Sequence, residues 1–380
     1  METKLPLNIV APINTLGYGV AGYNLFKELY KMNRFTALYP ISKPEFVDEY
    51  VQSGIENQKL VIKENKFRCI THGMNIPQSE TCCIAKGSPS VKVWHQNELH
   101  TNVGTGLQIG FPIFELTEFT QEEILSMSHC DKLFVCSEWA KDVLYNHKGW
   151  TCPSVHVVPL GVDADIFKPK QSARKETIFF NCGKWEKRKG HDILLECFNK
   201  AFKESENVEL WMMCDNPFIG SMNEQWKNLY KNSPLGNKIR IIPRQKTHKD
   251  VYNIMSQTDC GVFPARAEGW NLELLEMMAC GKDVIATNYS AHTEFCNKDN
   301  SYLIDISNLE RAYDGVFFSG SHGEWASFDE SAKQQLIEHM RTVHNNKQRA
   351  NEGVRLNTQG ILTAKQFSWK NSAQELLNGL

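Results

Sequence analysis

The sequence of 380 residues lacks any long apolar run, which excludes one large class of proteins. No stretch approaches the roughly 20 consecutive apolar residues that a membrane-spanning helix needs. The opening METKLPLNIVAPIN also lacks the apolar core and cleavage site of a secretory signal peptide. From these two absences we expect a cytoplasmic protein with no stable insertion into a membrane.

The sequence also lacks the closely spaced cysteine pairs that hold structural zinc. Its 12 cysteines are scattered singly apart from Cys82 and Cys83, and no CxxC motif occurs. Several lie in apolar runs, where a cysteine behaves as a small hydrophobic residue. This pattern favours a reducing compartment and predicts no metal site.

The sequence also shows no excess of positive or negative charge. The chain carries 42 basic and 44 acidic residues, a net charge of -2, and both signs are spread over its whole length. A dedicated nucleic-acid binder would show a basic footprint. With 41% hydrophobic and 23% charged residues, the composition is instead that of an ordinary globular protein.

What the sequence does contain is a regular alternation of short apolar strands and amphipathic helices, which predicts an α/β fold of two doubly wound parallel sheets. The pattern breaks over residues 159–176, where glycine, proline and charge predict a linker. We expect an N-terminal domain over 1–165, a C-terminal domain over 166–365 and a final helix over 366–380. The expected strands lie near 7–11, 35–40, 67–71, 91–95, 132–136 and 155–159, and near 177–182, 208–214, 239–242, 259–263 and 283–287.

The segment PARAEGWNLELLEMMACGKDVIAT, residues 264–287, says most about chemistry. It holds Glu268 and Glu276 on either side of a predicted helix start, and Gly281 is the expected helix stop. The first amides of such a helix lack internal partners and lie at the positive end of its dipole, so they suit a phosphate. The two glutamates are then placed to bind hydroxyl groups of the same ligand.

A second segment points to the same ligand. GKWEKRKG, residues 183–190, follows a predicted strand, precedes a predicted helix and has a glycine at each end. Glycines let a loop approach a ligand closely, and fixed cations neutralise a diphosphate. The cations are Lys184, Lys187, Arg188 and Lys189. The alternative is a solvated basic turn, which the neighbouring glutamate pair makes less attractive.

Taken together, the motifs resemble those of family 4 glycosyltransferases, a retaining group with the GT-B fold. The resemblance is strongest over residues 130–300 and rests on SEWAKDVL, PLGVDADIF, GKWEKRKG, the glutamate segment and FSWKNSAQELL in the family's order. It implies two Rossmann-like domains around a cleft. The donor would lie on the C-terminal domain and the acceptor on the N-terminal one, with the last helix packing back on the first domain.

The resemblance also implies the reaction. A nucleotide-diphosphate-sugar, most commonly a UDP-sugar, would give its sugar to an acceptor hydroxyl with retained anomeric configuration and with no metal or cofactor required. The acceptor is left open among a glycan, a protein, a lipid and a modified nucleic-acid base. Two alternatives share the scaffold: a nucleotide-sugar epimerase, and a catalytically silent module that only binds carbohydrate or a partner.

Individual roles follow from the matched positions. Lys189 matches the family's diphosphate lysine, and Lys184 stands where the family most often has arginine, so the bidentate fork is lost there. Glu276 matches the ribose carboxylate and Glu268 the carboxylate near the transferred sugar. The family's Gly-Phe-Gly-Leu after the first glutamate is replaced by Gly269, Trp270, Asn271 and Leu272, and the amides of the last two are expected to point at donor oxygens.

The chemistry of sugar transfer explains these residue types independently. Breaking the anomeric bond builds positive charge on the sugar and negative charge on the diphosphate, so cations and a carboxylate both stabilise the transition state. No Cys/His or Ser/His nucleophile pair is evident. Front-face displacement, in which the leaving phosphate takes the acceptor proton, is therefore the expected mechanism. Its expected catalytic residues are Glu268, Lys189, Lys184 and His95.

Weaker candidates complete the set. Residues 17–22, GYGVAG, form a glycine loop whose Gly17 and Gly19 contact donor phosphate or acceptor, or else only shape a turn. His95 ends a predicted strand and contacts the sugar or is structural. Arg244 reaches the nucleotide or is a surface residue. Glu115 and Glu294 are lesser candidates, and Trp94, Trp139 and Trp185 are either a sugar platform or core.

Overall fold

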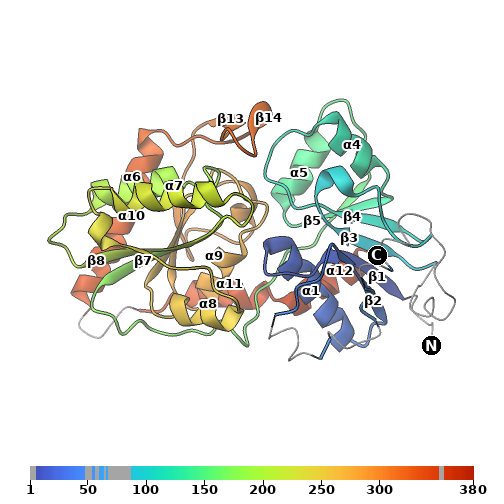
Figure 1. Cartoon of the computed structure of the whole chain (residues 1–380), viewed down its shortest axis with the longest axis horizontal. Coiled ribbons are helices and arrows are strands. Elements are labelled where there is room, and N and C mark those ends of the chain that lie inside the picture. Colours follow the sequence, from blue (N-terminus) through green and yellow to red (C-terminus); the bar gives the residue numbers. More distant parts are fainter. Residues whose placement is uncertain (1–5, 48–53, 56–59, 64–65, 67–86, 351–354) are drawn as a thin grey trace. The chain divides into compact units, whose positions relative to one another are not determined.

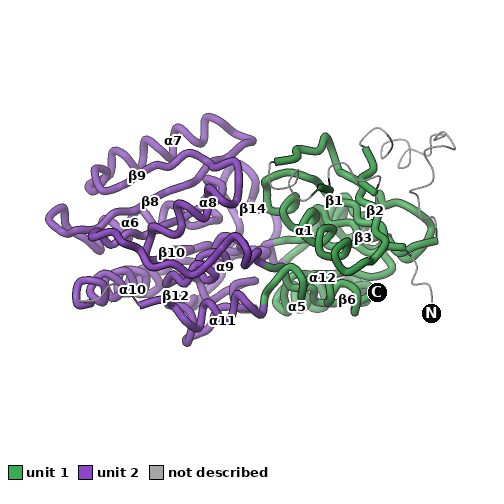
Figure 2. The backbone as a smooth tube through the Cα atoms, turned by 90° about the horizontal axis from the view of Figure 1, so that it is seen from below, with its two compact units in different colours: residues 1–114, 118–161, 367–380 green, residues 115–117, 162–366 purple. Residues whose placement is uncertain are grey.

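The computed structural model describes residues 6–47, 54–55, 60–63, 66, 87–350 and 355–380. The chain divides into two compact units (Figure 2). Unit 1 comprises residues 1–114, 118–161 and 367–380, and unit 2 comprises 115–117 and 162–366. Among the described residues, no helix is both long and apolar enough to cross a bilayer.

Unit 1 is built on a parallel sheet. Its described strands are ordered β2-β1-β3-β4-β5-β6, and every neighbouring pair is parallel. The strands are β1 (Leu7–Pro12), β2 (Thr36–Ile41), β3 (Ser90–Val93), β4 (Gln108–Phe111), β5 (Lys132–Val135) and β6 (Ser154–Val157). The helices are α1 (Gly17–Lys31), α4 (Gln121–Ser128), α5 (Glu138–Asn146) and α12 (Trp369–Asn378), with the 3-10 turn η2 (Gln96–Glu98).

Local sequence explains where these helices begin. Ser137 caps α5 by accepting a hydrogen bond from the Ala140 amide, as its position predicts. Ser368 caps α12 in the same way. This last helix packs against α1 (Figure 2). A Cβ on Gly161 would lie 2.2 Å from the backbone nitrogen of Trp369, so glycine permits the close approach of the two segments.

Unit 2 repeats the plan with a second parallel sheet, ordered β12-β11-β10-β7-β8-β9. Read from β9, the strands run third, second, first, fourth, fifth and sixth in chain order, which is the Rossmann arrangement. They are β7 (Thr177–Gly183), β8 (Val208–Cys214), β9 (Ile239–Ile241), β10 (Cys260–Phe263), β11 (Asp283–Thr287) and β12 (Tyr302–Ile304). A separate antiparallel hairpin joins β13 (Leu309–Tyr313) to β14 (Ser319–Ala326).

Helices cover both faces of this sheet (Figure 1). The helix α6 packs against α10 over one face, while α9 packs against α11 over the other. The bounds are α6 (His191–Ala201), α7 (Gly220–Lys231), α8 (His248–Met255), α9 (Leu272–Ala279), α10 (Glu330–Arg349) and α11 (Thr358–Gln366), with the 3-10 turns η3 (Gly236–Lys238) and η4 (Ser290–Glu294). Because both faces are covered, β7 and β10 are almost wholly buried and read as continuous apolar runs.

The prediction of two parallel α/β sheets is confirmed. The strand expected over 67–71 lies outside the described residues. The sequence reading missed β4, β12 and the hairpin β13–β14. The first two are only four and three residues long, and β14 (SGSHGEWA) is rich in glycine and serine, so neither propensity nor apolar spacing marks them.

Candidate functional site

The turn between β7 and α6 is shaped by its two glycines. Gly183 has φ 140°, and a Cβ there would lie 3.0–3.1 Å from the end of the Lys189 side chain. Gly190 has φ 72° and caps α6, and a Cβ there would lie 1.9 Å from the carbonyl oxygen of Pro264. Glycine therefore brings the basic loop directly against the glutamate segment, which the sequence alone could not place.

Arg266 fastens the two segments together. Its guanidinium donates to both carboxylate oxygens of Asp192 at 2.8 Å and to the Lys187 carbonyl at 2.6 Å. Its backbone amide donates to the carbonyl of Arg188 at 2.7 Å. A bidentate pair of this kind has fixed geometry as well as strength, so the loop is held in one conformation.

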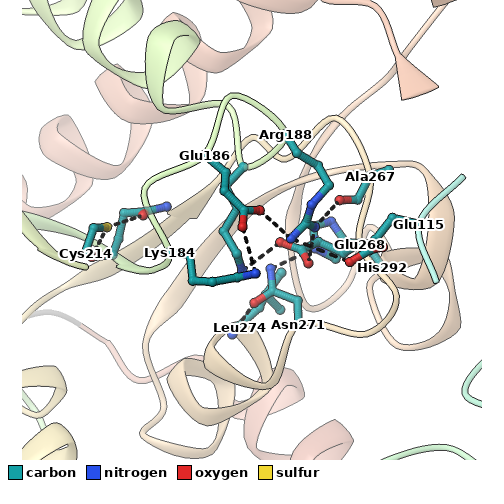
Figure 3. A network of polar contacts seen from close by, with 12 residues as sticks. Glu115, Lys184, Glu186, Arg188, Cys214, Ala267, Glu268, Asn271, Leu274 and His292 are labelled. Atoms are coloured by element: carbon teal, nitrogen blue, oxygen red, sulfur yellow. Dashed lines mark hydrogen bonds and ion pairs between the residues drawn. The ribbon is translucent and has the colours of Figure 1, made fainter. Parts of the chain in front are cut away.

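Within this frame, cations and carboxylates alternate in one connected network (Figure 3). Lys184 pairs with Glu186 at 2.8 Å, and Glu186 pairs with Arg188 at 2.8 Å. Arg188 continues to Glu268 at 2.9 Å, and Lys189 contacts the other oxygen of Glu268 at 2.9 Å. The basic loop is thus a set of paired charges rather than a solvated turn.

The network lies largely out of water. Arg188 is 4% exposed and Glu268 5%, whereas the side chain of Lys184 is 35% exposed. Burial works to raise the pKa of Glu268, but Lys189 and Arg188 outweigh it and hold that pKa well below its usual range. Burial works to lower the pKa of Lys189, and Glu268 reverses this and raises it. Both side chains are therefore charged at neutral pH.

The start of α9 lies beside this network (Figure 3). Asn271 adopts φ 83°, and its side-chain oxygen accepts from the Leu274 amide at 3.2 Å. Its side-chain amide donates to Nε2 of His292 at 2.9 Å, so His292 is neutral and donates from Nδ1 to the Thr287 carbonyl. Burial lowers the pKa of His292 to about 4. Asn271 thus caps α9 and also connects the start of this helix to His292.

The structure brings together several predicted residues of unit 2. Lys184, Lys189, Glu268 and Asn271 share the network and its edge. Gly269 lies two residues before Asn271, and Leu272 follows Asn271 as the first residue of α9. Two further predicted residues are buried: Trp270 has its ring 4.9 Å from that of Phe295, and Glu276 lies inside α9. Arg244, by contrast, is exposed and follows β9.

The predicted residues of unit 1 lie near one another. Gly17 and Gly19 belong to the first turn of α1 rather than to a loop, because only four residues lie between β1 and the helix. Tyr18, between them, has its ring 4.7 Å from that of His95. His95 immediately precedes η2 and is exposed. The expectation that residues 17–22 form a loop is therefore wrong, because they lie in α1, while a role of Gly17 and Gly19 in binding stays a prediction.

The other candidates separate clearly. Trp185 is fully buried and stacks on Trp226 at 5.8 Å, so it belongs to the core of unit 2 and is no sugar platform. Trp94 and Trp139 are partly buried and pack against the core of unit 1. Glu294 ends η4. Glu115 approaches Arg188 at 3.6 Å.

Sequence reasoning missed three residues of this site. Glu186 stands between the lysines of the basic loop, and its alternation with them was a usable signal. Arg266 and His292 lie in segments that offer no such signal, since their partners are 74 and 21 positions away. Among the described residues, no cluster of three or more histidine, cysteine or acidic side chains is arranged to hold a metal.

The arrangement of two parallel α/β sheets is also found in solved structures of other proteins. The structure superposes on sucrose-phosphate synthase of Thermosynechococcus elongatus with a TM-score of 0.70 at 14% identity, covering 99% of this chain and 98% of that one. HepE of Anabaena, solved with UDP and glucose, gives a TM-score of 0.67 at 11% identity over 98% of both chains. The fold is GT-B, as the sequence resemblance predicts.

Sequence comparison points to glycosyltransferases over part of the chain. Residues 162–316 match the family model of the glycosyl transferases group 1, and the predicted kinship with glycosyltransferases is confirmed. Mannosylfructose-phosphate synthase of Agrobacterium fabrum is 21% identical over 301 residues, which is 72% of this chain and 63% of that protein. The aligned regions of the first curated relatives thus span slightly less than two thirds of their length.

Proposed function

We propose that this protein is a retaining, metal-independent glycosyltransferase of family 4 that moves a sugar from a nucleotide-diphosphate-sugar to an acceptor hydroxyl. The observation that carries the proposal is the buried ionised Glu268 held between Arg188 and Lys189, beside the more exposed amine of Lys184. The network places a carboxylate and cations side by side, which is what stabilising both developing charges of a glycosyl transfer requires.

In the proposed mechanism the cations bind the leaving group. The amines of Lys184 and Lys189 have donors beyond those their carboxylates take, and each can bind a phosphate oxygen. The amides at Asn271 and Leu272, at the start of α9, add the positive end of a helix dipole. Glu276, on the same helix, is proposed to bind the ribose, and Arg244 and Trp270 to line the nucleotide side.

Glu268 is proposed to face the sugar. The bond from the anomeric carbon to the diphosphate oxygen breaks while the acceptor oxygen bonds to the same face of that carbon. The acceptor proton passes to the departing phosphate oxygen, so no protein nucleophile is needed. The carboxylate stabilises positive charge on the sugar, and the lysines stabilise negative charge on the diphosphate.

The remaining assignments are part of the proposal. Unit 2 would bind the donor and unit 1 the acceptor, with Gly17, Gly19 and His95 contributing to sugar or acceptor contacts. A UDP-sugar is the favoured donor because the similar HepE was solved with UDP and glucose. The acceptor is proposed to be a glycan, a protein, a lipid or a modified nucleic-acid base, and the reaction to take place in the cytoplasm.

A donor panel tests the function. The protein is incubated with UDP-, GDP- and ADP-sugars, with and without EDTA, and nucleoside diphosphate release is measured beside sugar products. We expect slow hydrolysis of one donor, unaffected by EDTA, with loss of about 100-fold or more of the rate in Glu268→Gln. A new sugar epimer without release would favour the epimerase, and binding of nucleotide with no turnover of any donor would favour the silent module.

A further inference from the structure

Arg188 differs from the lysines around it in how completely its donors are used. Nη1 donates to the Ala267 carbonyl at 2.8 Å and to Glu268 Oε2 at 2.9 Å. Nη2 donates to Glu186 at 2.8 Å and lies 3.6 Å from Glu115. A guanidinium so buried and so fully engaged has little left to offer a phosphate.

Its backbone is equally fixed. The carbonyl of Arg188 accepts from the Arg266 amide, and the next residue but one, Gly190, is pressed against Pro264. Glu186, which holds Nη2, is itself buried, and its amide donates to Nδ1 of His191 at 3.2 Å. Arg188 therefore cannot swing toward a ligand without breaking several buried contacts.

The two oxygens of Glu268 are held in different ways. Oε2 accepts a well-aligned hydrogen bond from Arg188. Oε1 is buried and lies 2.9 Å from the amine of Lys189. Lys189 has a long, flexible side chain, whereas Arg188 is fixed by its other contacts, so the contact with Lys189 is the more easily exchanged of the two. A diphosphate would compete with Glu268 for the amine of Lys189.

We propose that Arg188 is a positioning residue, which keeps Glu268 in place and charged while Lys189 exchanges Glu268 Oε1 for the donor diphosphate. The inference rests on the proposed function. Oε1 then faces the sugar, and the carboxylate keeps a partner on Oε2 throughout. Arg188 contacts no substrate; it acts through Glu268, and Glu186 acts through Arg188 and Lys184.

Two substitutions separate this role from direct phosphate binding. Arg188→Lys keeps one charge but cannot bridge Glu186, Ala267 and Glu268 together. We expect its affinity for UDP and for inorganic pyrophosphate to stay within about twofold of wild type while kcat falls about 100-fold. Lys189→Ala should instead weaken both ligands about tenfold or more. Arg240→Lys, at an exposed arginine of β9, is the matched control and should change neither quantity.

The pH profile gives a readout that a purely structural role would not move. The groups facing Glu268 are the charged side chains of Lys189 and Arg188 on the basic loop and the neutral imidazole of His292 on η4, with Glu115 and Glu186 beyond Arg188. Because Arg188 lowers the pKa of Glu268, Arg188→Gln should shift the acidic limb of kcat to higher pH. Arg188→Lys should leave that limb nearer to its wild-type position.

The outcomes are distinct. Equal losses in UDP affinity and kcat for Arg188→Lys would make Arg188 a phosphate ligand and overturn the inference. An acidic limb that stays in place in Arg188→Gln, with kcat reduced, would also overturn it. If Arg188→Gln does not fold, Arg188→Lys still tests the inference, because its loss of UDP affinity can be compared with its loss of kcat. A wild-type protein that binds neither UDP nor pyrophosphate would contradict the proposed function instead.

Discussion

In each unit a turn connects the first strand of the sheet to the first helix. The two turns differ in charge. Between β1 and the body of α1, residues 13–22 carry no charged side chain. Between β7 and α6, residues 184–190 carry four cations and Glu186. Both turns depend on glycine, so glycine content alone does not distinguish them.

The glycines serve different ends. In unit 1 a Cβ on Gly22 would lie 2.2 Å from the Cβ of Ala11, so that glycine lets α1 pack closely on β1. In unit 2 Gly190 makes room for Pro264, and Gly183 makes room for Lys189. Glycine in the first turn serves helix packing, whereas in the second it serves the placement of charges. The comparison teaches that a shared topology supplies positions, and that local side chains decide the chemistry.

The largest expected effect comes from breaking the unit 2 turn. Gly190→Ala combines a left-handed backbone with a contact of 1.9 Å to Pro264. We expect it to cost roughly 3–5 kcal/mol of unfolding free energy. Gly17→Ala in the other turn meets no atom within 4 Å and should change stability by less than about 1 kcal/mol. Urea unfolding followed by tryptophan fluorescence measures both, and equal losses would refute the comparison.

A smaller effect tests which charges in the unit 2 turn act in catalysis. Lys189→Ala should reduce kcat/KM about 100- to 1,000-fold, or roughly 2.7–4 kcal/mol. Lys187 donates to the Tyr313 carbonyl at 3.1 Å outside the Glu268 network, and Lys187→Ala should cost less than about fivefold. Steady-state kinetics with the donor found in the panel provides the measurement. Similar losses in the two variants would mean that total charge, not position, matters.

The smallest effect is the acid sensitivity of unit 2. Burial lowers the pKa of His191 to about 3 and that of His292 to about 4, while burial and Asp259 raise the pKa of Asp283 to about 6. Below pH 6.5 the unfolded state takes up protons at both histidines that the folded state refuses, so each makes stability fall as the pH falls. Asp283 acts oppositely between pH 6 and 4, because there the folded state binds the extra proton.

From pH 6 to 5 each group therefore changes the free energy of unfolding by about 1.4 kcal/mol per pH unit. The two histidines lower it and Asp283 raises it, so the net result is a loss of about the same size. His292→Gln should remove this slope, and Asp283→Asn should about double it. Thermal unfolding midpoints across this range give the measurement. A slope of the same sign and size in all three proteins would show that other groups control it.

Much of this molecule was predictable because its signals are local. Strands such as β7 and β10 are buried on both faces and stand out as apolar runs, and Ser137 and Ser368 are recognisable helix caps. The glutamate segment and the basic loop were each visible as motifs. The hairpin β13–β14 was not, because its strands are largely polar and only partly buried and because its contacts, such as that of Trp325 with Glu310, are not visible in the sequence.

What the amino-acid order determined by itself was the alternation of strands and helices, the kinship with sugar transferases, and the list of charged side chains available near a phosphate. Only the tertiary structure decided how those charges are shared. The order of the chain cannot show that the guanidinium of Arg188 is surrounded by three carboxylates while the side chain of Lys184 stays partly exposed. Pairing depends on distances below 4 Å between residues up to 80 positions apart, and packing around Gly190 and Arg266 sets those distances.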